Sequence, residues 1–405
     1  KIHFLIKYIK PCKLQGFIYL KNYFRLTFFL NLTMNCLLTG GTGIVGSHII
    51  FEWLHKAIIH KTVQHLFVII RNSEKSAQER LMSILQDESR PEFLNNFTLE
   101  ECLEKITVIP QDLATITKKT LRKYSFDTVI HCAGSTNLLN TNDSKEKVHT
   151  QNYLVTKQLL KEIPEQVTRF LYISTAYSFG IQDRKVNDRI ENYKVTDFRN
   201  PYEKSKYESE RFVKETCNAK NINAQILRPS IICGRLIDMP FYETPKFDVF
   251  YSWAIFLDKY AKKAKENFRI WVDRKSGLNI VPVDFVSKAI LHAYLNPSIK
   301  ELNIVNPKQI LHKNYVGNVL ESFDINTYEY VEEKPENLNA FEQLYYKSIG
   351  GLFEKYVAIP DLQFKPEEIL KLIEKLQLDI TLGVHENFMN LIDFSVEKKF
   401  RKSYL

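Results

Sequence analysis

The chain has 405 residues, of which 44% are hydrophobic, 13% aromatic and 25% charged. These proportions exclude a collagen, a disulfide-stabilised miniprotein and a wholly disordered chain. The net charge is +9, but six positive charges precede Met34, on Lys1, Lys7, Lys10, Lys13, Lys21 and Arg25, which leaves +3 for the rest. So weakly basic a body is not expected to bind nucleic acid.

Residues 1–33 are aromatic and basic and show no helical or strand periodicity. Cations interrupt every window of about 20 residues, so a membrane-spanning helix is not expected, and no apolar run leads to a signal-peptide cleavage site. We expect an N-terminal extension that is non-native or disordered, with Met34 as the true start. A basic segment lying on a membrane surface is the alternative.

Six cysteines are scattered along the chain, without a C-x-x-C pair or a metal-binding spacing to histidine. Cys36, Cys132 and Cys233 lie in or beside apolar runs, where cysteine packs as a small hydrophobic residue. We predict reduced thiols, no metal site and a cytoplasmic protein.

Short apolar runs in the first 230 residues predict the strands of a sheet. Helix-like segments, such as 47–54, 155–162 and 203–216, lie between them. Apolar strands that alternate with helices predict a parallel sheet covered on both faces, which is a doubly wound α/β (Rossmann) fold. The predicted strands are 36–38, 66–70, 106–109, 128–130, 170–173 and 224–227.

A glycine-rich turn separates the first predicted strand from the first helix. It has the spacing G-x-x-G-x-x-G, and it stands in the strand–turn–helix context that dinucleotide-binding sites require. Glycines let the backbone approach a pyrophosphate, and the helix N-terminus supplies free N–H groups. We assign cofactor binding to Thr39, Gly40, Gly43, Ile44, Val45 and Gly46.

The second predicted strand ends at a cation. NAD-binding sites usually place Asp or Glu here against the ribose 2′-hydroxyl, whereas a cation suits the 2′-phosphate of NADP. Arg71 ends the strand and Arg80 follows on the next helix. We therefore predict NADP(H) in preference to NAD(H).

Residues after the third and fourth strands are further cofactor candidates. Asp112 and Leu113 follow the third strand, where the carboxylate either meets the adenine amino group or belongs to an ordinary turn. Ala133 follows the fourth strand, where small residues allow close approach to the cofactor. His131, just before it, is interpreted as a packed histidine.

Tyr202 and Lys206 stand four residues apart on a predicted helix and therefore share a face. A nearby ammonium favours the phenolate, so we expect the pKa of Tyr202 to fall from about 10 towards the range of general acid–base catalysis. Ser174 and Thr175 follow the fifth strand, at the sheet edge where ligands bind, and alternation lets only one of them join Tyr202. The alternative is an exposed helix face.

After Gly234 the chain becomes richer in Lys, Glu, Phe and Tyr, with helical runs. We predict a Rossmann domain over 34–235, to which 275–307 return, and a smaller, mostly helical substrate-binding domain over 236–274 and 308–405. Its aromatic segments 249–257 and 341–356 either line a substrate pocket or pack as a helical core.

In this order, the motifs resemble those of an extended short-chain dehydrogenase/reductase. Arg228-Pro229-Ser230 with Gly234, and Val281-Pro282-Val283-Asp284, also match that family's pattern, and counting back from Gly180 places its catalytic hydroxyl on Thr175. A narrower resemblance is to the fatty acyl-CoA reductase, male-sterility and thioester-reductase branch. It rests on residues 68–71 with 76–81, on 174–177 and on 202–210. The departures are Gln111, Gly134 and Val155, which stand where the family usually has Gly, Ala and Gly.

The resemblance implies an NADPH-dependent oxidoreductase of lipid metabolism, with Thr175, Tyr202 and Lys206 as catalytic residues. Its substrate would be a fatty acyl thioester, reduced to an aldehyde or alcohol and carried by coenzyme A or an acyl carrier protein. We expect no integral membrane segment, and a monomer or homodimer. The alternatives are a nucleotide-sugar epimerase or dehydratase, a hydroxysteroid-type dehydrogenase, and a non-catalytic NADP-binding sensor.

Overall fold

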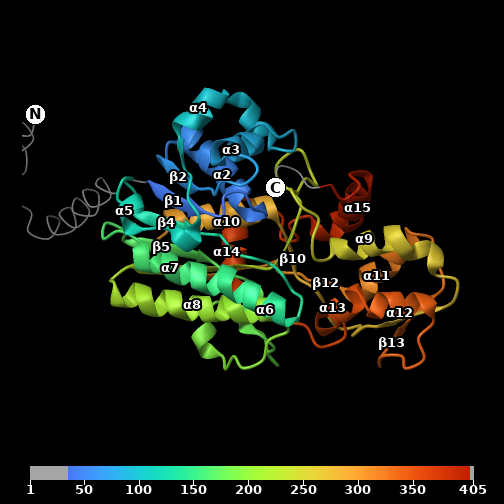
Figure 1. The fold of residues 1–405 in the computed structure, drawn as a ribbon. Helices are drawn as coiled ribbons and strands as arrows, with labels where there is room; N and C mark the ends of the chain where they lie inside the picture. Colours follow the sequence, from blue (N-terminus) through green and yellow to red (C-terminus); the bar gives the residue numbers. More distant parts are fainter. Residues whose placement is uncertain (1–34, 402–405) are drawn as a thin grey trace, which may run out of the picture.

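A computed structural model describes residues 35–401, and the predictions for residues 1–33 lie outside them. Seven parallel strands form the central sheet in the order β11-β6-β5-β4-β1-β2-β3 (Figure 1). This order reverses between β1 and β4, as in a doubly wound fold, so the predicted fold class is confirmed. The strands are β1 (Cys36–Thr39), β2 (Leu66–Ile69), β3 (Ile106–Ile109), β4 (Thr128–His131), β5 (Arg169–Ile173), β6 (Asn223–Pro229) and β11 (Glu301–Ile304).

Helices cover both faces of the sheet because every central strand is apolar on both sides. Leu37 belongs to a buried cluster with residues of α7 and α8, whereas its neighbour Leu38 belongs to a second cluster with residues of α2 and α10. This alternation is the period of two expected of a strand. The helices of this part are α2 (Ile44–His55), α3 (Ala77–Leu85), α4 (Leu99–Glu104), α5 (Lys118–Leu121), α6 (Asn142–Val148), α7 (Val155–Glu162), α8 (Pro201–Ala219) and α10 (Val283–Leu295).

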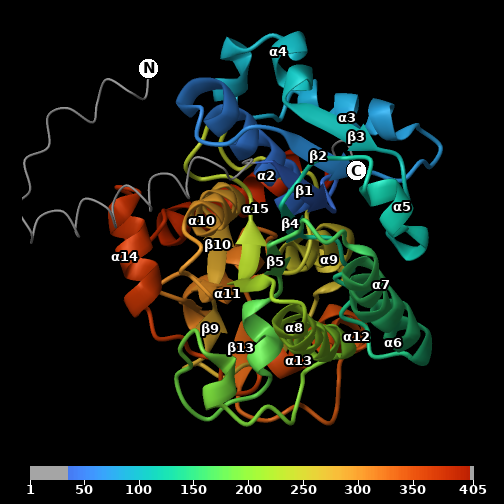
Figure 2. The same cartoon turned by 90° about the vertical axis from the view of Figure 1, so that its left-hand side faces the viewer.

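A second group of helices lies beside the sheet, at the right of Figure 1. It comprises α9 (Tyr251–Tyr260), α11 (His312–Glu321), α12 (Ala340–Tyr346), α13 (Ile349–Val357) and α15 (Val384–Glu397). From this group the chain returns in α14 (Glu367–Lys375), which contacts β11 and stands beside α10 in Figure 2. Within residues 35–401, no helix combines the length and apolar character needed to cross a membrane.

Three short strand pairs connect the sheet to these helices. β7 (Ile231–Cys233) pairs in parallel with β10 (Ile280–Pro282). β9 (Gly277–Leu278) pairs antiparallel with β12 (Ile310–Leu311), and β8 (Phe268–Trp271) pairs in parallel with β13 (Tyr328–Val331). The chain thus crosses between the sheet and the helices several times, which brings distant segments to the carboxyl edge of the sheet.

Candidate active site

The glycine-rich turn closes tightly between β1 and α2. Gly40 has φ +72°, and a Cβ there would lie 2.6 Å from the backbone nitrogen of Ala133. A Cβ on Gly46 would lie 2.0 Å from the carbonyl oxygen of Gly40. Neither position admits a side chain, so the backbone is bare where α2 begins, as a phosphate cradle needs.

The predicted 2′-phosphate residues meet at the outer edge of this turn. The Arg80 guanidinium donates to the carbonyl oxygen of Arg71 at 2.9 Å and to Oγ1 of Thr42 at 3.2 Å. Asp112 accepts from the backbone N–H of Ala114 at 2.8 Å and lies 4.0 Å from Arg71, in an exposed ion pair. Arg80 is thus held against the glycine-rich turn, with Arg71 beside it.

The end of β4 is fixed by a buried histidine. Nδ1 of His131 lies 2.7 Å from Oγ1 of Thr39, and Nε2 lies 2.8 Å from Oγ1 of Thr156. Burial, aided by the charge of Lys206, lowers the pKa of His131 to about 3, so the ring is neutral. Its interpretation as a packed histidine is confirmed. The backbone N–H of Ala133 donates to the same Thr39 hydroxyl at 3.3 Å.

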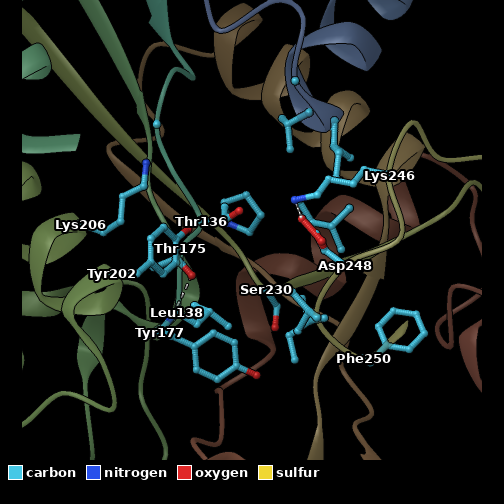
Figure 3. Close-up of a pocket in the computed structure, with 18 of the residues that line it drawn as sticks. Thr136, Leu138, Thr175, Tyr177, Tyr202, Lys206, Ser230, Lys246, Asp248 and Phe250 are labelled. Atoms are coloured by element: carbon cyan, nitrogen blue, oxygen red, sulfur yellow. Dashed lines mark hydrogen bonds and ion pairs between the residues drawn. The ribbon is translucent and has the colours of Figure 1, made fainter. Parts of the chain in front are cut away.

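Helix α8 places Tyr202 and Lys206 against the end of β5. The Thr175 hydroxyl hydrogen-bonds to Tyr202 and also accepts from the backbone N–H of Tyr177, at 3.3 Å. Nζ of Lys206 donates to the carbonyl oxygen of Ile173 at 2.9 Å. The three predicted catalytic side chains therefore lie on one side of a cavity (Figure 3).

The neighbouring hydroxyl of Ser174 is used differently. It donates to the carboxylate of Glu210, two turns along α8 from Tyr202. That carboxylate also holds the guanidinium of Arg228 on β6, at 2.7 Å. Of the two hydroxyls after β5, only that of Thr175 bonds to Tyr202. Strand alternation predicts that only one of them does so, and the spacing from Gly180 indicates which one.

The pKa of the catalytic phenol differs from the sequence-based prediction. Burial raises the pKa of Tyr202 above its ordinary value, and the nearby Cys132 and Glu203 add to this, whereas the Thr175 hydrogen bond opposes it. The expected lowering of this pKa is wrong because burial has the largest effect on it. Burial also lowers the pKa of Lys206 to about 8. Tyr202 is therefore a neutral phenol near pH 7, able to donate a proton.

Asn152 bonds to residues near Lys206 from a π-helical turn (His149–Leu154). Such distortions are common at functional sites. Its Nδ2 donates to Oγ of Ser205 at 2.9 Å, and its Oδ1 accepts from the backbone N–H of Ser135 at 2.6 Å. A Cβ on Gly134 would lie 3.0 Å from Oδ1 of Asn152 and 3.2 Å from Nζ of Lys206. An alanine here would therefore require these two side chains to shift by a few tenths of an ångström.

One cavity of about 350 Å³ connects the glycine-rich turn with the predicted catalytic side chains. Lys246 and Asp248 form an ion pair on the side opposite Tyr202 (Figure 3). The predicted residues that line the cavity are Gly40, Gly43, Ile44, Val45, Gly46, Thr175, Tyr202 and Lys206. The predicted residues that do not line it are Thr39, Arg71, Arg80, Asp112, Leu113 and Ala133.

The helical part supplies cavity residues that carry no motif. Lys246 and Asp248 lie in a loop, and nothing in their spacing marks them. The aromatic segments 249–257 and 341–356 each contribute some residues to the cavity and others to the helical core. Phe250, Trp253, Phe353 and Tyr356 line the cavity, whereas Phe256, Phe341 and Tyr345 pack in the core.

A family model described as male sterility protein matches residues 38–290. A comparison with curated proteins found no match. Among solved structures, the terminal R domain from the myxalamid PKS-NRPS biosynthetic pathway aligns with a TM-score of 0.63 at 17% identity, covering 92% of this chain and 93% of that chain.

Two further solved structures have a similar fold. The thiolation-reductase di-domain of an archaeal non-ribosomal peptide synthetase aligns with a TM-score of 0.62 at 18% identity, covering 90% of this chain and 76% of that chain. UDP-glucuronic acid 4-epimerase from Bacillus cereus, in complex with UDP-glucuronic acid and NAD, aligns with a TM-score of 0.60 at 16% identity, covering 90% of this chain and 99% of that one. At these identities the likeness shows the fold alone.

Proposed function

Because the chain belongs to the male sterility protein family, a nicotinamide-dependent branch of the extended short-chain dehydrogenases/reductases, we propose that it reduces an acyl thioester with NADPH. The observation that carries the proposal is the cavity itself. The Tyr202 and Thr175 side chains line it together with the glycine-rich turn and an apolar wall formed by Phe250, Trp253 and Phe353. Such a wall suits an alkyl chain.

The residues present fit a nicotinamide cofactor. The glycine-rich turn is bare where a Cβ on Gly46 would collide with the backbone, and α2 begins directly beyond it. Arg80 and Arg71 would hold the 2′-phosphate, and Lys206 the ribose hydroxyls. When bound, the cofactor supplies the hydride for the carbonyl carbon.

Side chains of the protein would bind the carbonyl oxygen of the substrate and supply its proton. Tyr202, a neutral phenol, would donate its proton to the carbonyl oxygen as negative charge develops there. Thr175 would hold that oxygen by a second hydrogen bond, and the Lys206 ammonium would favour the phenolate that remains. One hydride and one proton convert a thioester to an aldehyde and a free thiol, and a second pair gives the alcohol.

The Lys246–Asp248 pair suits the polar pantetheine part of a thioester substrate. The side chain of Lys246 is 38% exposed, whereas Trp253 and Phe353 are buried, so the polar side of the cavity is also its more open side. Oδ1 of Asp248 is buried and has no hydrogen-bond partner. An amide N–H of a pantetheine arm would satisfy it, with the acyl chain lying against the apolar wall.

We further propose that coenzyme A or a carrier protein delivers the acyl group, and that the protein works in the cytoplasm. The five cysteines among the described residues are free, which supports a reducing compartment.

The test follows NADPH absorbance with acyl-CoA substrates of increasing chain length, in wild type, Tyr202→Phe and Tyr207→Phe. Tyr207 is the matched control because it lies on the same helix but does not line the cavity. We expect oxidation that depends on chain length, falls about a hundredfold or more in Tyr202→Phe and persists in Tyr207→Phe. NADPH binding without turnover of any thioester, together with conversion of a UDP-sugar, would contradict the proposal in favour of the epimerase alternative.

A further inference from the structure

Helix α13 contacts the first turn of α8 through a hydroxyl that the proposed chemistry does not use. The Tyr356 hydroxyl donates to Oε1 of Glu203 at 2.6 Å and accepts from Nδ2 of Asn200, also at 2.6 Å. Asn200 caps α8, because its Oδ1 accepts from the backbone N–H of Glu203 at 3.0 Å. One hydroxyl therefore joins both the cap and the first turn of the helix that carries Tyr202.

The partners of this hydroxyl are buried and are held from other directions as well. Glu203 is 0% exposed, and its Oε2 accepts from the backbone N–H of Arg199 at 2.9 Å. The Arg199 guanidinium lies 3.8 Å from the same oxygen and donates to the carbonyl oxygens of Gly180 and Lys355 at 2.9 and 3.1 Å. Because Lys355 precedes Tyr356, two consecutive residues of α13 are tied to the entry of α8.

The same helix forms part of the cavity. Phe353, Tyr356 and Val357 are three and four residues apart, so they share one face, and all three line the cavity. The ring of Tyr356 packs edge-on against that of Tyr177, with centroids 5.7 Å apart. Helix α13 therefore both bonds to the first turn of α8 and forms part of the cavity lining.

We propose that Tyr356 is a positioning residue for Tyr202. Through Glu203, it fixes the first turn of α8, and hence the Tyr202 phenol, relative to the wall that α13 presents to the substrate. The inference rests on the proposed role of Tyr202 as proton donor, but it holds for any carbonyl substrate that this phenol serves.

The first test removes only the hydroxyl, with Tyr356→Phe. The matched control is Tyr346→Phe on α12, whose hydroxyl also makes two bonds, to the carbonyl oxygen of Arg269 and the backbone N–H of Trp271, both at 3.0 Å, away from the cavity. We expect kcat to fall about tenfold in Tyr356→Phe, with KM for substrate and NADPH within about twofold of wild type. Tyr346→Phe should leave kcat unchanged. A rise in KM alone would overturn the proposal, because Tyr356 would then act by touching the substrate.

The second test asks whether Tyr356 acts through Glu203. We expect Glu203→Gln to lower kcat to a similar extent, and the double variant to be no worse than either single one, within about twofold. Effects that multiply would overturn the proposal. Glu203→Gln breaks the same link from the α8 side, so the link stays testable if Tyr356→Phe does not fold.

A third measurement needs no substrate. Amide hydrogen exchange across residues 199–206 should rise several-fold in Tyr356→Phe and stay at the wild-type rate in Tyr346→Phe. If wild type turns over no thioester, the proposed function fails, and the exchange result still decides this inference. Unchanged exchange in both variants would overturn it.

Discussion

Lys206 is predicted to lose its charge near pH 8. Burial lowers the pKa of Lys206 from its ordinary 10.5 to about 8, so the ammonium is present below that pH and lost above it. In the proposed mechanism, Lys206 binds the ribose and stabilises the Tyr202 phenolate only when it is charged. We therefore expect kcat/KM for NADPH to fall as the pH rises through about 8. A profile over about pH 6 to 10 reports the free enzyme and checks this. A flat profile across pH 8 contradicts it.

A single guanidinium should set the choice of cofactor. The Arg80 guanidinium bonds to the carbonyl oxygen of Arg71 and to the hydroxyl of Thr42. The charge that acts on it most is that of another cation, Arg71, rather than that of a carboxylate. We expect Arg80→Met to weaken NADPH binding about tenfold or more, because charge-assisted hydrogen bonds to the 2′-phosphate are lost, and to leave NADH binding unchanged. Fluorescence titration measures both constants. Lys75→Met, an exposed cation nearby, is the control, and an equal loss for both cofactors would contradict the assignment.

At the scale of elements, a buried ion network joins α8 to two strands. Arg228 on β6 is 0% exposed and holds Glu210 of α8 at 2.7 Å and Glu301 of β11 at 2.6 Å. Because Ser174 also donates to Glu210, the network reaches the residue beside Thr175. It therefore fixes the middle of α8 against the sheet, whereas the link with α13 holds the first turn of the helix.

We expect Glu210→Gln to lower the free energy of unfolding by about 3 kcal/mol, because it leaves a buried guanidinium short of one countercharge. Glu215→Gln is the control on the same helix. The Arg211–Glu215 pair is 62% and 67% exposed, and exposed pairs add little. Urea denaturation measures both variants. Equal midpoints for the two would show that the network does not carry stability.

At the scale of the whole molecule, cofactor binding should stabilise the fold by mass action. At a concentration about a hundredfold above its Kd, NADPH adds about 2.7 kcal/mol to the free energy of unfolding. In Gly46→Ala, the new Cβ meets the Gly40 carbonyl oxygen at 2.0 Å, so the turn cannot keep its shape. We expect NADPH to raise the Tm of wild type and not that of the variant, with circular dichroism to check that the variant is folded. A wild-type shift in Gly46→Ala would contradict this.

The sequence predicted six strands of the sheet correctly because each is a short run of mostly apolar residues. It did not predict β11, because Glu301 and Asn303 interrupt the apolar pattern. The Glu301 carboxylate pairs with Arg228, and Nδ2 of Asn303 donates to the carbonyl oxygen of Asn187. The position of a strand at the edge of a sheet, and the pairing of its buried polar groups, depend on tertiary structure and cannot be predicted from the local sequence. For the same reason the motifs located Tyr202 but not Tyr356, which lies far along the chain and meets the site only through folding.

The extent to which a side chain is removed from water likewise cannot be predicted from the spacing of residues in a sequence. The four-residue spacing of Tyr202 and Lys206 correctly predicted a shared helix face, but the direction of the pKa shift on Tyr202 depends on burial, which no spacing reveals.

Every strand of the central sheet lies between Cys36 and Ile304, whereas α13 begins only at Ile349. During translation, the glycine-rich turn and the sheet therefore leave the ribosome before the helix that completes the substrate wall. Every residue of the glycine-rich turn is therefore synthesised before Phe353, Tyr356 and Val357, which complete the lining of the cavity.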